Sequence, residues 1–235
     1  MEMKSYADLL DLQKVDSQID RLLHDRENLP ELASYKAAHG KVEELTAVEA
    51  DATEKLKQTT RSLDRTQGEL GLAETKLERE QLRLYSGGMS ARDTDYLRRE
   101  VEMLRTNKSK MEDELLRLME SSEEQEKSVQ AVQAELAEVT IEKDRLASLI
   151  QAAWKALDGE LARREARKAD LLPTIDPDMV TLYEELRGRK NGVGVAALED
   201  GVCGGCHLSL TATEELEAKR SDPPRCIHCR RILVV

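Results

Sequence analysis

A heptad repeat of apolar residues constrains the fold of this 235-residue chain more than any other feature. From Leu97 to Leu157, alternating steps of four and three residues reach eighteen positions, of which fourteen are apolar. A period of 3.5 residues maintained this long is typical of a coiled coil. The earlier segment from Val42 to Leu84 has a similar seam. Two long helices are therefore predicted, and each needs a partner along one face.

The segment between the two seams, YSGGMSARDTDY, has the composition of a turn. Gly87 and Gly88 can adopt the left-handed backbone that ends a helix. Ser90 and Asp93 have the spacing of a capping box, which begins a new one. We therefore predict the turn of an antiparallel hairpin near residues 86–94.

One antiparallel register satisfies both seams. If Leu84 faces Leu97, other apolar pairs such as Leu77 with Leu104 also come together. The two helices of one chain are thus predicted to pair with each other. The centre of the seam is more polar, at Glu49, Thr59, Ser122 and Gln125. These layers either fix the register or mark a local weakness that bends or admits a partner.

The ends of the hairpin are marked by prolines. Pro30 falls where the first apolar run goes out of phase with the later seam, which predicts a kink near residue 30. We expect the N-terminal helix to pack near residues 158–172, with Trp154 in the core beside it. Pro173 is taken as the end of the hairpin domain, residues 1–172, and the start of a second domain, residues 173–235.

The second domain begins with a short linker helix. Asp176 can cap this helix with Pro177 at its first position, and Asn191 with Gly192 can stop it. The stretch VGVAALEDG then predicts a strand and a turn. Further on, Thr211 and Glu214 have capping-box spacing for another short helix.

Two C-x-x-C pairs hold all four cysteines of the chain: Cys203, Cys206, Cys226 and Cys229. Four thiolates from two such turns form the closed tetrahedral set that structural zinc prefers. We assign these cysteines to one structural Zn²⁺ in a C4-type zinc ribbon of about residues 193–235. Redox-active pairs of thioredoxin type and an iron–sulfur cluster are the alternatives, and both are less favoured by two pairs in glycine-containing turns.

No catalytic site is predicted. Four cysteines fill a tetrahedral zinc site and leave no open position for a substrate or water. The sequence has no glycine-rich phosphate loop after a strand, and no nucleophile set beside a plausible histidine and acid. We therefore expect a protein that is not an enzyme and has no small-molecule substrate.

The charge balance bears on location and partners. The net charge is −11, so the surface should on average repel nucleic acid. The N-terminus lacks the features of a secretion signal, and no apolar run is long enough to cross a bilayer, so we expect a cytoplasmic protein without membrane contact. A basic tail lies beside the cysteines and consists of Lys219, Arg220, Arg225, Arg230 and Arg231. Without aromatic residues among them, we interpret these side chains as ordinary solvated charge, and the alternative is a surface that contacts phosphates or a partner.

Several segments resemble a bacterial family of coiled-coil proteins with a C-terminal C4-type zinc ribbon. They include LLDLQKVDSQIDRL, YSGGMSARDTDYLRREVE, LYEELRGRKNGVGVAAL, CGGCHLSL and CIHCRRIL. The resemblance implies a rod with a zinc head that acts by binding, and it carries over the four cysteines as ligands. Some members are linked to regulation of flagella or type III secretion, through an alternative sigma factor, secretion components or RNA. The family tends to have glycine after the last cysteine, where this chain has Arg230.

The expected function is that of a non-enzymatic adaptor or scaffold. The expected fold is mainly α-helical, a long antiparallel coiled-coil hairpin with a small zinc-ribbon domain. The hairpin would bind protein partners along its length, and the ribbon would dock protein or nucleic acid. The alternative is a regulatory protein that binds RNA or DNA directly through its basic ribbon. The sequence leaves the oligomeric state open.

Overall fold

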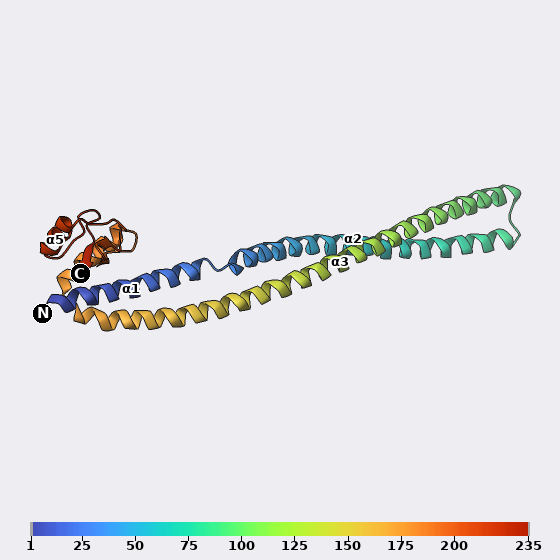
Figure 1. Ribbon diagram of the computed structural model, residues 1–235. Coiled ribbons are helices and arrows are strands. Elements are labelled where there is room, and N and C mark those ends of the chain that lie inside the picture. Colours follow the sequence, from blue (N-terminus) through green and yellow to red (C-terminus); the bar gives the residue numbers. More distant parts are fainter. Residues whose placement is uncertain (1, 235) are drawn as a thin grey trace. The chain divides into compact units, whose positions relative to one another are not determined.

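The computed structural model describes residues 2–234 and is mainly helical, as predicted (Figure 1). The long helices come first, and they are α1 (Glu2–Glu27), α2 (Glu31–Tyr85) and α3 (Ala91–Leu171). They are followed by the 3-10 turn η1 (Leu172–Thr174), α4 (Pro177–Arg189), β1 (Val195–Glu199), β2 (Val202–Cys203), α5 (Ala212–Arg220) and β3 (Ile232–Val234). The chain forms two compact units, Ser34–Arg145 and the combination of Met1–Ala33 with Leu146–Val235. Each unit is described separately below.

In the unit Ser34–Arg145, α2 and α3 run antiparallel and are joined by the predicted turn (Figure 1). Gly87 and Gly88 have φ angles of 73° and 83°, a left-handed backbone that glycine adopts at little cost. Ser90 accepts a hydrogen bond of 3.2 Å from the backbone N–H of Asp93, and its hydroxyl donates to the Asp93 carboxylate at 2.6 Å. The cap of α3 therefore lies where the sequence predicts it.

The two helices of this unit are held in one register by apolar and polar pairs. Leu77 of α2 packs with Val101 and Leu104 of α3 in a buried cluster. Lys108 Nζ lies 3.0 Å from the Glu74 carboxylate, and Gln133 donates to Glu49 at 2.7 Å. These contacts agree with the predicted pairing of Leu77 with Leu104.

The polar centre of the seam is only partly satisfied. Glu49 has a partner across the hairpin, in Gln133. The amide nitrogen of Gln125 donates to Ser121 on its own helix at 3.3 Å. Among the described residues, the Gln125 side-chain oxygen is buried without a hydrogen-bond partner. A buried acceptor left unpaired costs free energy, so this layer is a weaker part of the hairpin.

In the other unit, α1 lies beside the C-terminal end of α3 (Figure 1). Arg26 of α1 forms an ion pair of 3.0 Å with Asp158, within the region where this packing is predicted. The Trp154 indole N–H donates to the Arg26 carbonyl at 3.1 Å, and the Arg26 guanidinium lies 5.9 Å from the ring centroid. Trp154 is 36% exposed, so the prediction that it belongs to the core is wrong. Its ring packs at the surface, where a cation can cover one face.

A small three-stranded sheet forms the centre of this unit. The strand order is β2-β1-β3, with β1 antiparallel to β2 and parallel to β3. Because successive strand residues point to opposite faces, Val195 and Ile232 join one buried cluster while Ala196 and Leu233 join another. The first cluster contains residues of α1 and α4, and the second contains Cys203 and Cys226.

No helix within residues 2–234 is both long enough and apolar enough to cross a membrane.

Candidate metal centre

The four cysteines come from two turns of the same backbone design. In the first turn, the N–H of His207 donates to the carbonyl of Cys203 at 2.8 Å, and the N–H of Cys203 donates to the carbonyl of Leu208 at 3.1 Å. In the second turn, the N–H of Arg230 donates to the carbonyl of Cys226 at 2.8 Å. The N–H of Cys226 completes the pattern by donating to the carbonyl of Arg231 at 3.0 Å. Each turn thereby presents two thiols on one side.

The residue after each second cysteine must adopt a left-handed backbone. His207 and Arg230 occupy these equivalent positions, with φ angles of 59° and 66°. Such a backbone is unfavourable for residues that carry a Cβ, and it favours glycine. The geometry of the turn therefore favours glycine at Arg230, the position where the sequence resemblance also leads us to expect glycine.

The distances between the sulfur atoms fit a four-coordinate metal. The sulfurs of Cys203 and Cys229 are 3.9 Å apart, as are those of Cys206 and Cys226, and all four lie within 4.8 Å of one another. A disulfide would require about 2.05 Å. Four sulfurs placed tetrahedrally at about 2.3 Å from a zinc ion would be separated by about 3.8 Å. The cysteine cluster could thus hold a metal ion such as zinc.

The environment makes the thiols unequal in acidity. Burial raises the pKa of Cys203 to about 12 and also raises the pKa of Cys226. Burial acts in the same direction at Cys229, but hydrogen bonds from Arg231 and from the neighbouring thiols outweigh it and lower the pKa to about 7. Four thiolates this close together would repel one another, and a bound cation would relieve that repulsion.

The five predicted basic residues differ in the contacts that their side chains make. The Arg231 guanidinium donates to the carbonyls of Val193 and Lys190 at 2.8 and 3.0 Å. This side chain therefore stabilises the backbone at the start of the cysteine region, residues 193–234. Lys219 forms an ion pair with Glu215 one turn earlier on α5. The remaining three, Arg220, Arg225 and Arg230, have no ion-pair partner within residues 2–234. Arg220 and Arg230 are exposed.

Sequence reasoning missed the residues that attach α1 to the cysteine region. The Gln13 side chain donates to the carbonyl of Gly192 at 2.8 Å and accepts from the N–H of Gly194 at 2.7 Å. It therefore holds the backbone that leads into β1. Gln13 and Asp16 lie on the same face of α1 as the buried Leu9 and Leu12. Two polar residues inside an apolar stripe were the signal that could have identified this contact.

Asp16 is the centre of a buried polar network. Its carboxylate is 1% exposed, accepts a 2.6 Å hydrogen bond from the Tyr183 hydroxyl, and lies 2.9 Å from Lys168 Nζ. Arg187 lies 3.8 Å from the same carboxylate and 2.6 Å from Asp20. Burial, the hydrogen bond and the charge of Asp16 together raise the pKa of Tyr183, so its hydroxyl remains a proton donor. The network ties α1 to α3 and α4.

Comparisons with known proteins agree with the helical hairpin. Residues 12–191 match the model of the CT398-like coiled coil hairpin domain. Two uncharacterized proteins from strains of Mycobacterium tuberculosis are 27% identical to this chain, over 96% of its length and 93% of theirs.

Solved structures share the fold. A protein from Mycobacterium smegmatis superimposes with a TM-score of 0.83 at 23% identity, covering 100% of this chain and 98% of its own. CT398 from Chlamydia trachomatis superimposes with a TM-score of 0.55 at 19% identity, covering 98% of this chain and 97% of its own. HP0958 from Helicobacter pylori superimposes with a TM-score of 0.51 at 19% identity, covering 98% of this chain and 96% of its own. With a family model that matches most of its length, this chain belongs to the CT398-like coiled-coil hairpin family.

Proposed function

We propose that this protein is a non-enzymatic, zinc-binding adaptor. In this proposal the α2–α3 hairpin binds a partner protein, and a C4-type zinc ribbon formed by residues 193–235 docks a second protein or a nucleic acid. The observation that carries it is the combination of a paired-helix surface with a set of four thiols that would fill a tetrahedral site. A closed site of this kind stabilises a fold and has no position at which a substrate could react.

The residues that would hold the zinc are Cys203, Cys206, Cys226 and Cys229. When bound, the ion supplies a structural crosslink between the two cysteine turns. We expect one zinc per chain by elemental analysis of protein purified without added metal. Replacement of Cys226 and Cys229 by serine should abolish the zinc, whereas Thr213→Ala, on the exposed side of α5, should leave it unchanged. Iron at the same stoichiometry with zinc absent would contradict the assignment.

The adaptor role is tested by affinity capture from cells of the source organism, using the full chain. Wild-type protein should recover a reproducible set of proteins, and the Cys226→Ser/Cys229→Ser variant should lose the subset that docks on the ribbon. The Thr213→Ala variant again serves as the matched control. If wild-type protein recovers nothing beyond the background of unrelated coiled coils, the adaptor role fails.

A second candidate function, direct binding of RNA or DNA, is favoured by one observation. Arg220, Arg225 and Arg230 have no ion-pair partner among the described residues, so their charge is available to phosphates. Binding of single-stranded RNA should weaken steeply with salt, and Arg220→Ala/Arg230→Ala should reduce the salt slope by about 2. The control is Arg189→Ala, because Arg189 is paired with Glu185 at 3.1 Å. No binding of RNA or DNA at low salt would exclude this function.

A further inference from the structure

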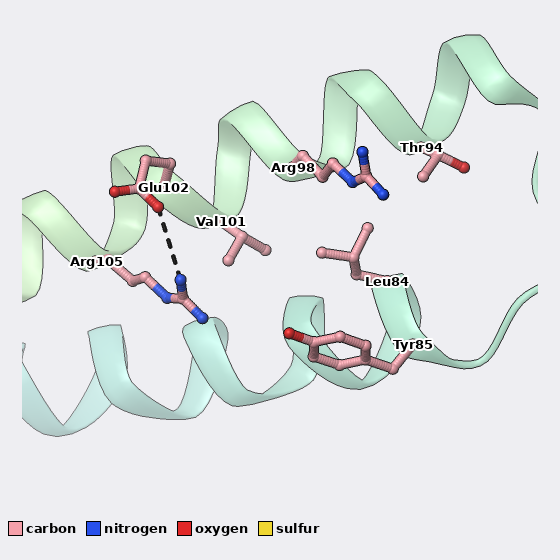
Figure 2. Close-up of a pocket in the computed structure, with 7 residues that line it drawn as sticks. All are labelled: Leu84, Tyr85, Thr94, Arg98, Val101, Glu102 and Arg105. Carbon is pink, nitrogen blue, oxygen red and sulfur yellow. Dashed lines mark ion pairs between the residues drawn. The ribbon is translucent and has the colours of Figure 1, made fainter.

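A groove near the hairpin turn, within the unit Ser34–Arg145, has the features of a docking site. We call it the tip groove, and its volume is about 440 Å³. It is lined by Leu84, Tyr85, Thr94, Arg98, Val101, Glu102 and Arg105 (Figure 2). The lining residues of α3 are spaced by three or four residues, with Glu102 directly after Val101, so they lie on one face of the helix. The other wall is the last turn of α2.

The floor of the tip groove is apolar, and one exposed tyrosine lies at its edge. Leu84 and Val101 belong to the seam between the helices and line the groove in Figure 2, where Val101 is buried and Leu84 is partly exposed. Tyr85 is 77% exposed, although it is a large ring immediately beside the seam. Exposed tyrosine is enriched at protein interfaces, since it offers a large contact area at a low entropic cost.

The charged side chains that line the tip groove have a small positive excess. The groove contains Arg98 and Arg105 against Glu102, whereas the whole chain has a net charge of −11. Arg105 lies 3.7 Å from Glu102, so its charge is partly balanced. Arg98 has no ion-pair partner among residues 2–234. In Figure 2 its guanidinium extends from α3 toward Leu84 of α2, beside the apolar floor.

We infer that the tip groove binds a protein segment that carries a carboxylate side chain close to an apolar one. The carboxylate would pair with Arg98, because a guanidinium without a partner offers a fork of donors to it. The apolar side chain would cover the exposed part of Leu84 and pack against the ring of Tyr85. This inference rests on the proposed adaptor function, and it assigns both a binding surface and a partner chemistry to the hairpin.

The observations favour a protein segment over a nucleic acid. A nucleic acid strand presents a continuous row of phosphates, while the lining of the tip groove offers one unpaired arginine. Glu102 also lines the groove and would repel neighbouring phosphates. A segment with one or two carboxylates avoids this repulsion.

The test begins with a library of random displayed peptides selected on the full-length protein. Selection on wild-type protein, with depletion on Arg98→Glu, should enrich peptides that combine Asp or Glu with Leu, Ile, Met or Phe. One synthetic peptide from the enriched set is then titrated into protein labelled with 3-fluorotyrosine. The chain has five tyrosines, so the fluorine spectrum is simple and the signal of Tyr85 is identified by Tyr85→Phe. Peptide should shift the Tyr85 signal and leave the Tyr35 signal in place.

Matched variants separate the tip groove from the rest of the surface. Arg98→Glu should weaken peptide binding about tenfold or more, because it places like charges together. Arg117→Glu makes the same charge change on an exposed part of α3 and should have little effect. Tyr85→Ser should also weaken binding. Tyr96→Ser, which removes another exposed tyrosine outside the groove, should not.

Three results would overturn the inference. They are the absence of any enriched peptide, binding that is equal in wild type and Arg98→Glu, and a Tyr85 signal that responds to single-stranded DNA but to no peptide. The Arg98→Glu variant also enters the affinity capture described above. If wild-type protein recovers partners and Arg98→Glu retains them all, the tip-groove inference fails while the adaptor function stands. If wild-type protein recovers none, the adaptor function itself fails.

Discussion

Replacement of Asp16 by alanine should selectively destabilise the packing of α1. The substitution removes a carboxylate that is 1% exposed and leaves the Tyr183 hydroxyl without its acceptor. It also leaves Lys168 and Arg187 without their shared partner. Removing one member of a buried ion pair costs about 3–5 kcal/mol. Because the side chains of Lys168 and Arg187 are still 27% and 19% exposed, we expect the lower end of this range, about 3 kcal/mol.

The measurement is urea unfolding followed by the fluorescence of Trp154. This is the single tryptophan of the chain, and its indole donates to the carbonyl of Arg26, so its emission reports whether α1 is packed. With a urea m-value of about 2–3 kcal/mol/M, a loss of 3 kcal/mol lowers the midpoint by about 1–1.5 M. Asp16→Asn should fall between wild type and Asp16→Ala, since the amide oxygen can still accept from Tyr183.

Asp11→Ala is the matched control on the same helix. Asp11 pairs with Lys14 at 2.9 Å, and both side chains are more than half exposed. An exposed pair of this kind contributes about 0–1 kcal/mol. Equal midpoints for Asp16→Ala and Asp11→Ala would show that the buried network does not hold α1 in place, and the reasoning would be refuted.

Three further predictions concern single residues of the same unit. Gly194→Ala should lower the free energy of unfolding by more than about 2 kcal/mol, because the new Cβ would lie 2.7 Å from the carbonyl oxygen of Tyr183. The control is Gly188→Ala, which should be neutral or stabilising in thermal unfolding, because its Cβ would meet nothing within 4 Å. Arg230→Gly should raise stability by about 1 kcal/mol by relieving its φ of 66°, and a lower melting temperature would contradict this. Burial alone would lower the pKa of Lys168, but Asp16 and Glu184 more than offset it and raise the pKa. The stability from Lys168 should therefore be present below about pH 10 and lost as pH rises through the raised pKa, a dependence that Lys168→Met should remove from unfolding curves.

The local signals in the sequence were sufficient for the hairpin. A heptad seam depends on spacing alone, and Leu77 indeed lies in one cluster with Leu104. Glycine turns and side-chain caps are also local, so the helix boundary at Ser90 and the capping box at Thr211 were predictable. The capping box is complete, with Thr211 and Glu214 each accepting from the other's backbone N–H.

The parts that could not be predicted depend on contacts between distant segments. Arg231 was assigned to a basic surface, yet its guanidinium is bound by two backbone carbonyls about 40 residues earlier. Trp154 was assigned to the core, yet a cation covers it at the surface. In both cases the residue type allows burial, exposure or a polar role, and the choice is made by a neighbour that sequence spacing does not identify.

The small sheet explains why the first helix of the chain belongs with its last strands. Strands of two to five residues bury little surface alone, so both faces of the sheet need cover. Ala196 and Leu233 face the cysteine turns, and Val195 and Ile232 face Leu9 and Leu12 of α1 with Tyr183 of α4. The same strands thus line both clusters, and a single layer of backbone separates the cysteine turns from α1. The cysteine region is therefore a structural partner of α1, and variants that loosen either one should be studied in the full chain.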